Sequence, residues 1–80
     1  MKVLIVDDEA LARESLKMQI KQFTDAHLFE AGDGKTALAV LAKEKPELVF
    51  VDIRMPGIDG LELSDKIREH SAASKIIFIS

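Results

Sequence analysis

The sequence predicts an α/β fold, with a parallel sheet of four strands separated by three helices. Four short apolar runs, rich in β-branched or aromatic residues, are each bounded by turn-forming or polar residues. The segments between these runs are long enough for one helix each and carry apolar residues at helical spacing. Single helices between successive strands imply right-handed crossovers, and therefore helices on both faces of the sheet.

The first strand is predicted at residues 3–6, and it ends in a cluster of acidic residues. A helix is predicted to follow over residues 9–22, with Glu9 and Arg13 forming an i,i+4 ion pair near its amino end. Its inward face is predicted from apolar residues at spacings of four, four and three: Ala12, Leu16, Ile20 and Phe23.

The second strand, residues 27–31, contains Glu30, so we expect it at an edge of the sheet where one side meets water. Asp33 is a suitable N-cap for the next helix. Pro46 ends that helix, because the residue before a proline avoids the helical region. The buried side of the helix is predicted to contain Ala37, Leu38 and Leu41.

The third strand, residues 48–52, ends in the most informative side chain, Asp52. Its uninterrupted apolar run predicts burial on both faces, and Asp52 is the first polar residue after that run. Ligands of open α/β sheets bind at the carboxyl ends of the strands, so Asp52 is a candidate functional residue. The alternative is that Asp52 only caps the turn indicated by Pro56 and Gly57.

The last helix is predicted over residues 61–70 and the last strand over residues 76–80. The half-polar second strand suits an edge and the first and third suit the centre, which gives the strand order 2-1-3-4. The apolar fourth strand then lies at an edge with nothing beside it. The helix is predicted to have a cap, two inward residues and an outer ion pair: Asp59, Leu63 and Ile67, and Glu62 with Lys66.

Composition predicts one small soluble domain, residues 1–80. The net charge of −3 and the pI near 5.3 give no support to direct nucleic-acid binding. The absence of cysteine excludes a disulfide framework and a thiolate metal site, and it fits a cytoplasmic protein. No apolar run approaches the length of a membrane span, and the first residues do not form a signal peptide.

A candidate metal site follows from the predicted strand order. If the first and third strands are neighbours, their carboxyl ends bring Asp7, Asp8 and Asp52 to one edge of the sheet. Three adjacent carboxylates repel one another without a cation, and an open cluster of oxygen ligands suits Mg²⁺. Ser80 ends the fourth strand on the same edge, where its hydroxyl either donates to an oxyanion on Asp52 or is simply solvated. The histidines are isolated and are predicted to be surface residues: His27 and His70.

Three segments together resemble the receiver domain of two-component response regulators. They are V-L-I-V-D-D-E at residues 3–9, L-V-F-V-D-I-R-M-P-G-I-D-G at residues 48–60 and I-I-F-I-S at residues 76–80. The resemblance implies a flavodoxin-like sheet and a phosphoryl acceptor at Asp52, which takes its group from a phosphohistidine on a sensor histidine kinase. It also implies Mg²⁺ held by Asp52 and by Asp7 and Asp8, with Asp8 the closer ligand of that pair. The backbone carbonyl of Arg54 would complete the protein's ligands, and Ser80 matches the family's switch hydroxyl.

The chain departs from that family pattern after its fourth strand. It lacks the fourth helix, the fifth strand with a lysine that pairs with the phosphoryl group, and the last helix of a complete receiver. Lys75 cannot replace that lysine, because it lies at the far end of the fourth strand from Asp52. Loss of one such contact is expected to slow phosphorylation by on the order of a hundredfold. The uncovered fourth strand predicts pairing with a second copy, and hence a dimer or higher assembly.

Two other functions are compatible with these residues. A non-phosphorylated half-domain would act as an assembly module with an idle acidic edge. A Mg²⁺-dependent α/β phosphatase would also use an aspartate nucleophile, but it would need an acid two residues later, where this chain has Arg54. We therefore expect a signalling domain that phosphorylates itself, and not an enzyme that acts on an external substrate.

Overall fold

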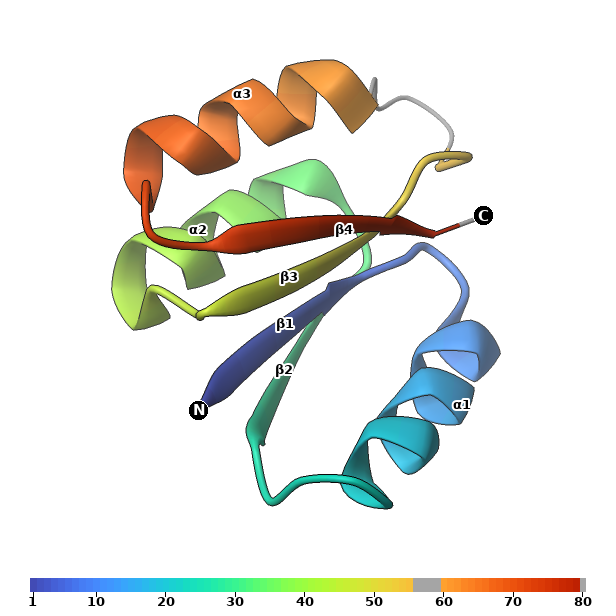
Figure 1. Ribbon diagram of the computed structural model, residues 1–80. Coiled ribbons are helices and arrows are strands. Elements are labelled where there is room, and N and C mark those ends of the chain that lie inside the picture. Colours follow the sequence, from blue (N-terminus) through green and yellow to red (C-terminus); the bar gives the residue numbers. More distant parts are fainter. Residues whose placement is uncertain (56–59, 80) are drawn as a thin grey trace.

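The chain forms three layers, with a parallel sheet between helices (Figure 1). The computed structural model describes residues 1–55 and 60–79. All the predicted helices and strands are present there, and their ends agree closely with prediction. They are β1 (Lys2–Val6), α1 (Ala10–Lys21), β2 (His27–Ala31), α2 (Gly34–Glu44), β3 (Leu48–Asp52), α3 (Gly60–His70) and β4 (Lys75–Ile79).

The strand order is β2-β1-β3-β4 and every pair is parallel, which confirms the predicted topology. In the register, Val6 lies opposite Val51, and Asp52 lies opposite Ile79. The carboxyl ends of β1, β3 and β4 therefore meet at one edge of the sheet. Helices α2 and α3 cover one face and α1 lies on the other (Figure 1).

The hydrophobic core lies between the sheet and the pair α2 and α3. Alternate strand residues point to this face, and burying each large apolar side chain contributes about 1.5–3 kcal/mol. The predicted inward residues Ala37, Leu41 and Ile67 are fully buried. The core consists of Leu4, Val6, Ala31, Ala37, Leu41, Val49, Val51, Met55, Leu63 and Ile67.

The opposite face is covered less completely. Helix α1 has no fully buried residue, so it covers this face of the sheet only in part. On β3, Val49 and Val51 are buried on the core face, while Leu48 and Phe50 are only half-buried on the face that carries α1. The prediction that β3 is buried on both faces is therefore wrong for one face. None of the described helices has the length and apolarity needed to cross a bilayer.

The predicted inward position of Phe23 is also wrong, because its side chain is 86% exposed. Helix α1 ends at Lys21, and the amide of Phe23 donates to the carbonyl of Ile20, three residues earlier. That tighter turn breaks the 3.6-residue periodicity and moves Phe23 off the inward stripe.

The helix ends follow local chemistry. The Asp33 carboxylate accepts a hydrogen bond from the Thr36 amide at 2.7 Å, which confirms the predicted N-cap and holds the pKa of Asp33 below its usual range. Helix α2 stops at Glu44, and Lys45 adopts a left-handed conformation with φ 48° before the buried Pro46. The predicted outer pair of α3, Glu62 and Lys66, is present at 3.9 Å. The predicted cap Asp59 lies outside the described residues.

Strand β4 is the exposed apolar edge that the sequence predicts. Within the described residues it pairs with β3 alone. Ile77 and Phe78 are each 40% exposed, although they point to opposite faces of the sheet. An edge strand with this much apolar surface is a site where a further strand can add.

Candidate functional site

Three carboxylates converge at the carboxyl ends of β1 and β3. One ligand oxygen from each of Asp7, Asp8 and Asp52 lies within 4.8 Å of the other two. Asp7 and Asp52 are buried, with 6% and 9% of their surface exposed, and Asp8 is open to solvent. The adjacency of β1 and β3 produces this cluster, because the residues that follow Val6 and Val51 in the register leave the sheet at the same place.

Two of the carboxylates are fixed by the turns that follow them. The Glu9 amide donates to Asp7 Oδ1 at 2.9 Å, and the Arg54 amide donates to Asp52 Oδ1 at 2.9 Å. Both bonds join residues two apart, as in Asx turns. Asp52 therefore does cap its turn, as the simpler alternative proposes, but only one of its oxygens is used by that bond.

None of the three carboxylates forms an ion pair with a protein side chain among the described residues. Each ion pair found in residues 1–55 and 60–79 joins other side chains. Burial of carboxylates without a cationic partner is costly, so the arrangement favours a bound cation. Three hard oxygen ligands with one side open to water fit Mg²⁺, which retains water and binds through a few carboxylates.

A groove leads from the cluster along the face that carries α1. It has a volume of about 370 Å³. Asp7, Asp52 and Arg54 line it at the acidic end, and Leu16, Gln19 and Ile79 line it between α1 and β4. The carboxylates are therefore accessible to a phosphate-sized group from solvent.

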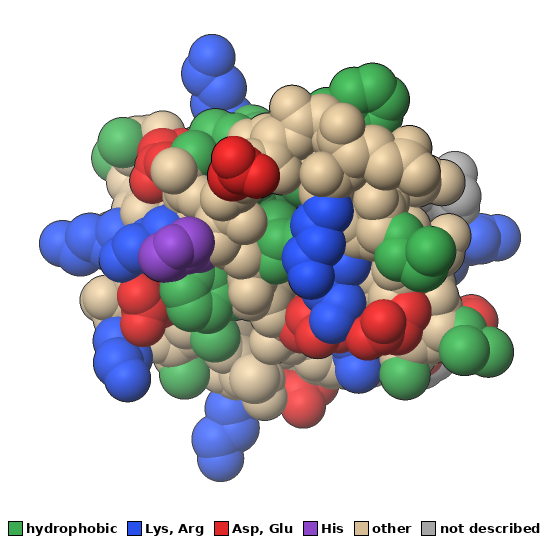
Figure 2. Space-filling model, turned by 90° about the horizontal axis from the view of Figure 1, so that it is seen from below, with side chains coloured by type: hydrophobic (Ala, Val, Ile, Leu, Met, Phe, Trp, Pro, Cys, Tyr) green, Lys and Arg blue, Asp and Glu red, His purple; other side chains and the backbone are tan. Residues whose placement is uncertain are grey.

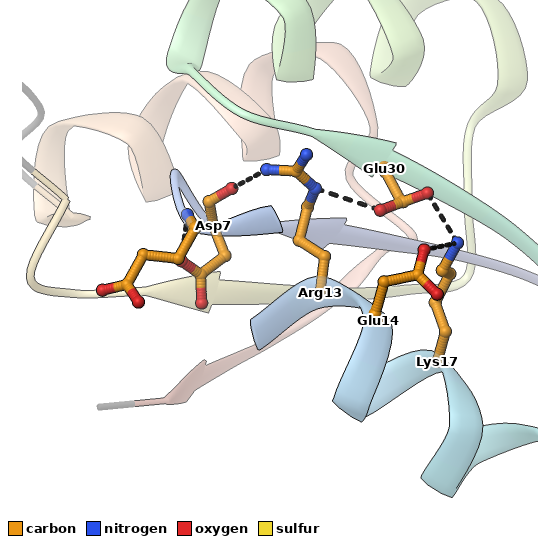
Figure 3. A network of polar contacts seen from close by, with 6 residues as sticks. Asp7, Arg13, Glu14, Lys17 and Glu30 are labelled. Carbon is orange, nitrogen blue, oxygen red and sulfur yellow. Dashed lines mark hydrogen bonds and ion pairs between the residues drawn. The ribbon is translucent and has the colours of Figure 1, made fainter. Parts of the chain in front are cut away.

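Arg13 connects the acidic edge to α1 and β2 (Figure 3). Its Nη1 donates to the backbone oxygen of Asp7 at 2.6 Å, and its Nε donates to Glu30 at 3.0 Å. Lys17 joins the same Glu30 at 2.8 Å and pairs with Glu14 at 2.9 Å. The predicted partner of Arg13, Glu9, is thus replaced by Glu30, because α1 lies against β2 and brings Arg13 over that strand.

These ion pairs shift the pKa values of the groups that form them. The hydrogen bond from Lys17, followed by that from Arg13, holds the pKa of Glu30 below its usual range. The bonds to Glu30 and Glu14 raise the pKa of Lys17. Figure 2 shows basic and acidic side chains side by side, with apolar ones between them, so the face in that view has mixed charge.

The remaining predicted site residues lie as follows. Arg54 lines the groove, and its side chain is exposed. Lys75 lies opposite Leu48 at the start of β4, while Asp52 lies opposite Ile79, which confirms that Lys75 is at the far end. Ser80 lies outside the described residues, so its switch role stays a prediction. The histidines are exposed, as predicted: His27 and His70.

The sequence is similar to known proteins over nearly its whole length. Residues 3–80 match the family described as response regulator receiver domain. The positive alginate biosynthesis regulatory protein of Pseudomonas aeruginosa is 44% identical over 80 residues, which cover 98% of this chain and 32% of that protein. The nitrate/nitrite response regulator protein NarL of Escherichia coli is 33% identical over 79 residues, or 98% of this chain and 37% of that protein. The chain thus spans about a third of the length of these relatives.

A solved structure supports the same relationship. The response regulator protein TrrA of Thermotoga maritima, in complex with Mg²⁺-BeF, is 38% identical. It superposes with a TM-score of 0.85 over 96% of this chain and 66% of that one. The fold, the acidic edge and the match over nearly all residues agree, and the chain belongs to the response regulator receiver domain family of two-component signalling proteins.

Proposed function

We propose that this chain is a partial receiver domain, residues 1–80, that accepts a phosphoryl group on Asp52. Mg²⁺ would be held by Asp7, Asp8 and Asp52, together with the backbone carbonyl of Arg54. The observation that carries the proposal is the convergence of three carboxylates from two neighbouring strands within 4.8 Å, with no cationic partner among the described residues.

We assign the nucleophile to Asp52, because its position in the third-strand motif matches the phosphoryl acceptor of the receiver family. One of its carboxylate oxygens attacks phosphorus, and the bond from phosphorus to the donor nitrogen of a phosphohistidine breaks. The electron pair of that bond returns to the imidazole, and an acyl phosphate forms. The Arg54 amide already holds Oδ1 at 2.9 Å, which orients the carboxylate before attack. A bound Mg²⁺ would neutralise charge on the transferring group, so catalysis rests on positioning and electrostatics.

The relationship to TrrA supports this metal. That receiver is 38% identical to this chain and was solved in complex with Mg²⁺-BeF. Here the same class of ligand, a hard cation with an anionic group, would meet an acidic edge that is open to the groove.

The phosphodonor we propose is a sensor histidine kinase, and we infer a cytoplasmic location from that partner. We infer no direct binding of nucleic acid or of a membrane by this segment, because its net charge is −3. Ser80 remains the proposed switch hydroxyl.

The test is phosphorylation with a small donor. Incubation of the 80-residue chain with acetyl phosphate and Mg²⁺ should add one phosphoryl mass that hydroxylamine removes. The gain should disappear in Asp52→Asn and without Mg²⁺, and it should persist in Asp65→Asn, which removes an exposed carboxylate on α3 as a matched control. Absence of any mass gain in the wild-type chain contradicts the proposed function.

A second candidate function is assembly through β4. It is favoured by the 40% exposure of Ile77 and Phe78 on a strand that pairs only with β3 among the described residues. We infer that two copies associate through this edge into a dimer or larger assembly, which would persist in a chain that is not phosphorylated. Sedimentation at micromolar concentration tests this association, and a chain that sediments only as a monomer would contradict it.

A further inference from the structure

The acidic edge is also contacted by a side chain outside the three carboxylates. Arg13, near the amino end of α1, reaches across to the backbone of Asp7 (Figure 3). We propose that Arg13 is a positioning residue for the cation site: its bond to the Asp7 carbonyl fixes the turn after β1 so that the Asp7 and Asp8 carboxylates face Asp52. This inference rests on the proposed function, because it assigns a role toward the same site.

The contacts of Asp7 show how little freedom the turn has. Its amide donates to the Ala31 carbonyl at 3.0 Å, its Oδ1 accepts from the Glu9 amide at 2.9 Å, and its carbonyl accepts from Arg13 at 2.6 Å. The bond from Arg13 is the only one of these made by a side chain from outside the turn and the sheet. A guanidinium that binds the carbonyl leaves the carboxylate oxygens available to a metal.

The guanidinium is itself fixed from two sides. Glu30 accepts from Nε at 3.0 Å, and the Arg13 side chain is only 19% exposed. A Cβ on Gly32 would lie 3.3 Å from Nη1, closer than most side-chain contacts. An alanine at residue 32 would therefore shift the guanidinium by a few tenths of an ångström. Because the planar fork of arginine serves two acceptors at once, lysine cannot replace it fully.

Lys17 provides a matched comparison on the same helix. Both basic side chains pair with Glu30 and both are 19% exposed. Helix α1 has no buried residue, so both pairs help to hold it on the sheet. Of the two, Arg13 alone bonds to Asp7. If both residues only hold α1 on the sheet, their substitution should change Mg²⁺ affinity to a similar extent. If Arg13 positions the ligands, substitution of Arg13 should weaken Mg²⁺ binding more than substitution of Lys17.

The direction in which Mg²⁺ affinity changes when Arg13 is removed distinguishes a positioning role from a purely electrostatic one. A cation near the site repels Mg²⁺, so if charge alone mattered, removal of Arg13 would strengthen Mg²⁺ binding. If Arg13 positions the ligands, its removal lets the turn relax and weakens binding. Loss of a residue that orients metal ligands typically costs about 10–100-fold in affinity.

The experiment is titration of the 80-residue chain with Mg²⁺ by isothermal calorimetry, with far-UV circular dichroism as a check on folding. Arg13→Met should weaken Mg²⁺ binding by about 10-fold or more. Lys17→Met should leave it within about 2-fold, because Lys17 pairs with Glu14 and Glu30 and does not bond to Asp7. Arg13→Lys should recover part of the affinity.

Each possible result of the Mg²⁺ titrations supports or overturns the positioning role of Arg13. A folded Arg13→Met chain that binds Mg²⁺ as well as or better than wild type overturns the inference, and so does equal weakening by Lys17→Met. Should Arg13→Met fail to fold, Arg13→Lys decides, because it keeps the charge but loses the planar fork: weaker binding than wild type supports the inference and wild-type affinity overturns it. A wild-type chain that binds no Mg²⁺ overturns both this inference and the proposed metal site, whereas the preceding outcomes overturn this inference alone.

Discussion

At the scale of single residues, the structure separates what spacing can predict from what it cannot. The meeting of Asp7, Asp8 and Asp52 follows from the sequence, because acids at the ends of neighbouring parallel strands must share one edge. The network of Arg13 and Glu30 does not follow, because it depends on the register that places Glu30 beside Ile5 and on where α1 lies over β2. From sequence alone, the nearer Glu9 was the natural partner.

The Glu30 network predicts a specific dependence of stability on pH. Lys17, and then Arg13, lower the pKa of Glu30 in the folded chain. The stability that Glu30 contributes is therefore complete above the ordinary pKa of glutamate and is lost as the pH falls through the lowered folded-state value. Glu30→Gln should destabilise the chain near neutral pH, and its free energy of unfolding should converge on that of wild type in acid.

The free energies of unfolding of wild type and Glu30→Gln can be measured at each pH by urea unfolding. Far-UV circular dichroism is the suitable probe, since the chain has no Trp or Tyr for fluorescence. The difference between the two proteins isolates Glu30 from the other carboxylates that titrate in the same range. A difference that stays constant from neutral to acid pH would rule out the ion pairs as its source.

At the scale of elements, the helices and strands were predictable because caps, turns and apolar periodicity agree along the chain. The errors lie on the face that carries α1. Phe23 leaves the inward stripe in a tighter turn, and Leu48 and Phe50 remain half-buried, because α1 covers only part of that face. Apolar periodicity indicates which residues can be buried, but not whether a partner element covers them.

The exposed edge of β4 leads to a test of association at the level of one strand. Ile77→Lys places a charge on an edge strand, and charges there oppose pairing with another strand. The variant should shift the chain toward monomer in sedimentation velocity, recorded by interference optics. Phe23→Lys removes an apolar side chain that is more exposed than Ile77 but lies far from β4, and it should leave the assembly unchanged. Dissociation by both variants would assign the assembly to general hydrophobicity and not to this edge.

At the scale of the whole molecule, the sheet order joins fold and function. Placing β1 beside β3 creates the acidic edge, and the groove beside α1 opens that edge to solvent. The family pattern was recognisable from three motifs, and the match over residues 3–80 confirms it. What remains to be measured is whether the three carboxylates act as one cation site.

The affinity of the chain for Mg²⁺, measured by calorimetry across single carboxylate variants, tests this most directly. Asp7→Asn, Asp8→Asn and Asp52→Asn should each weaken binding by about 10-fold or more, since each removes a charged ligand from the same ion. Asp65→Asn, an exposed carboxylate on α3, should bind as wild type. If any of the three behaves like Asp65→Asn, the carboxylates do not form a single site and the account is contradicted.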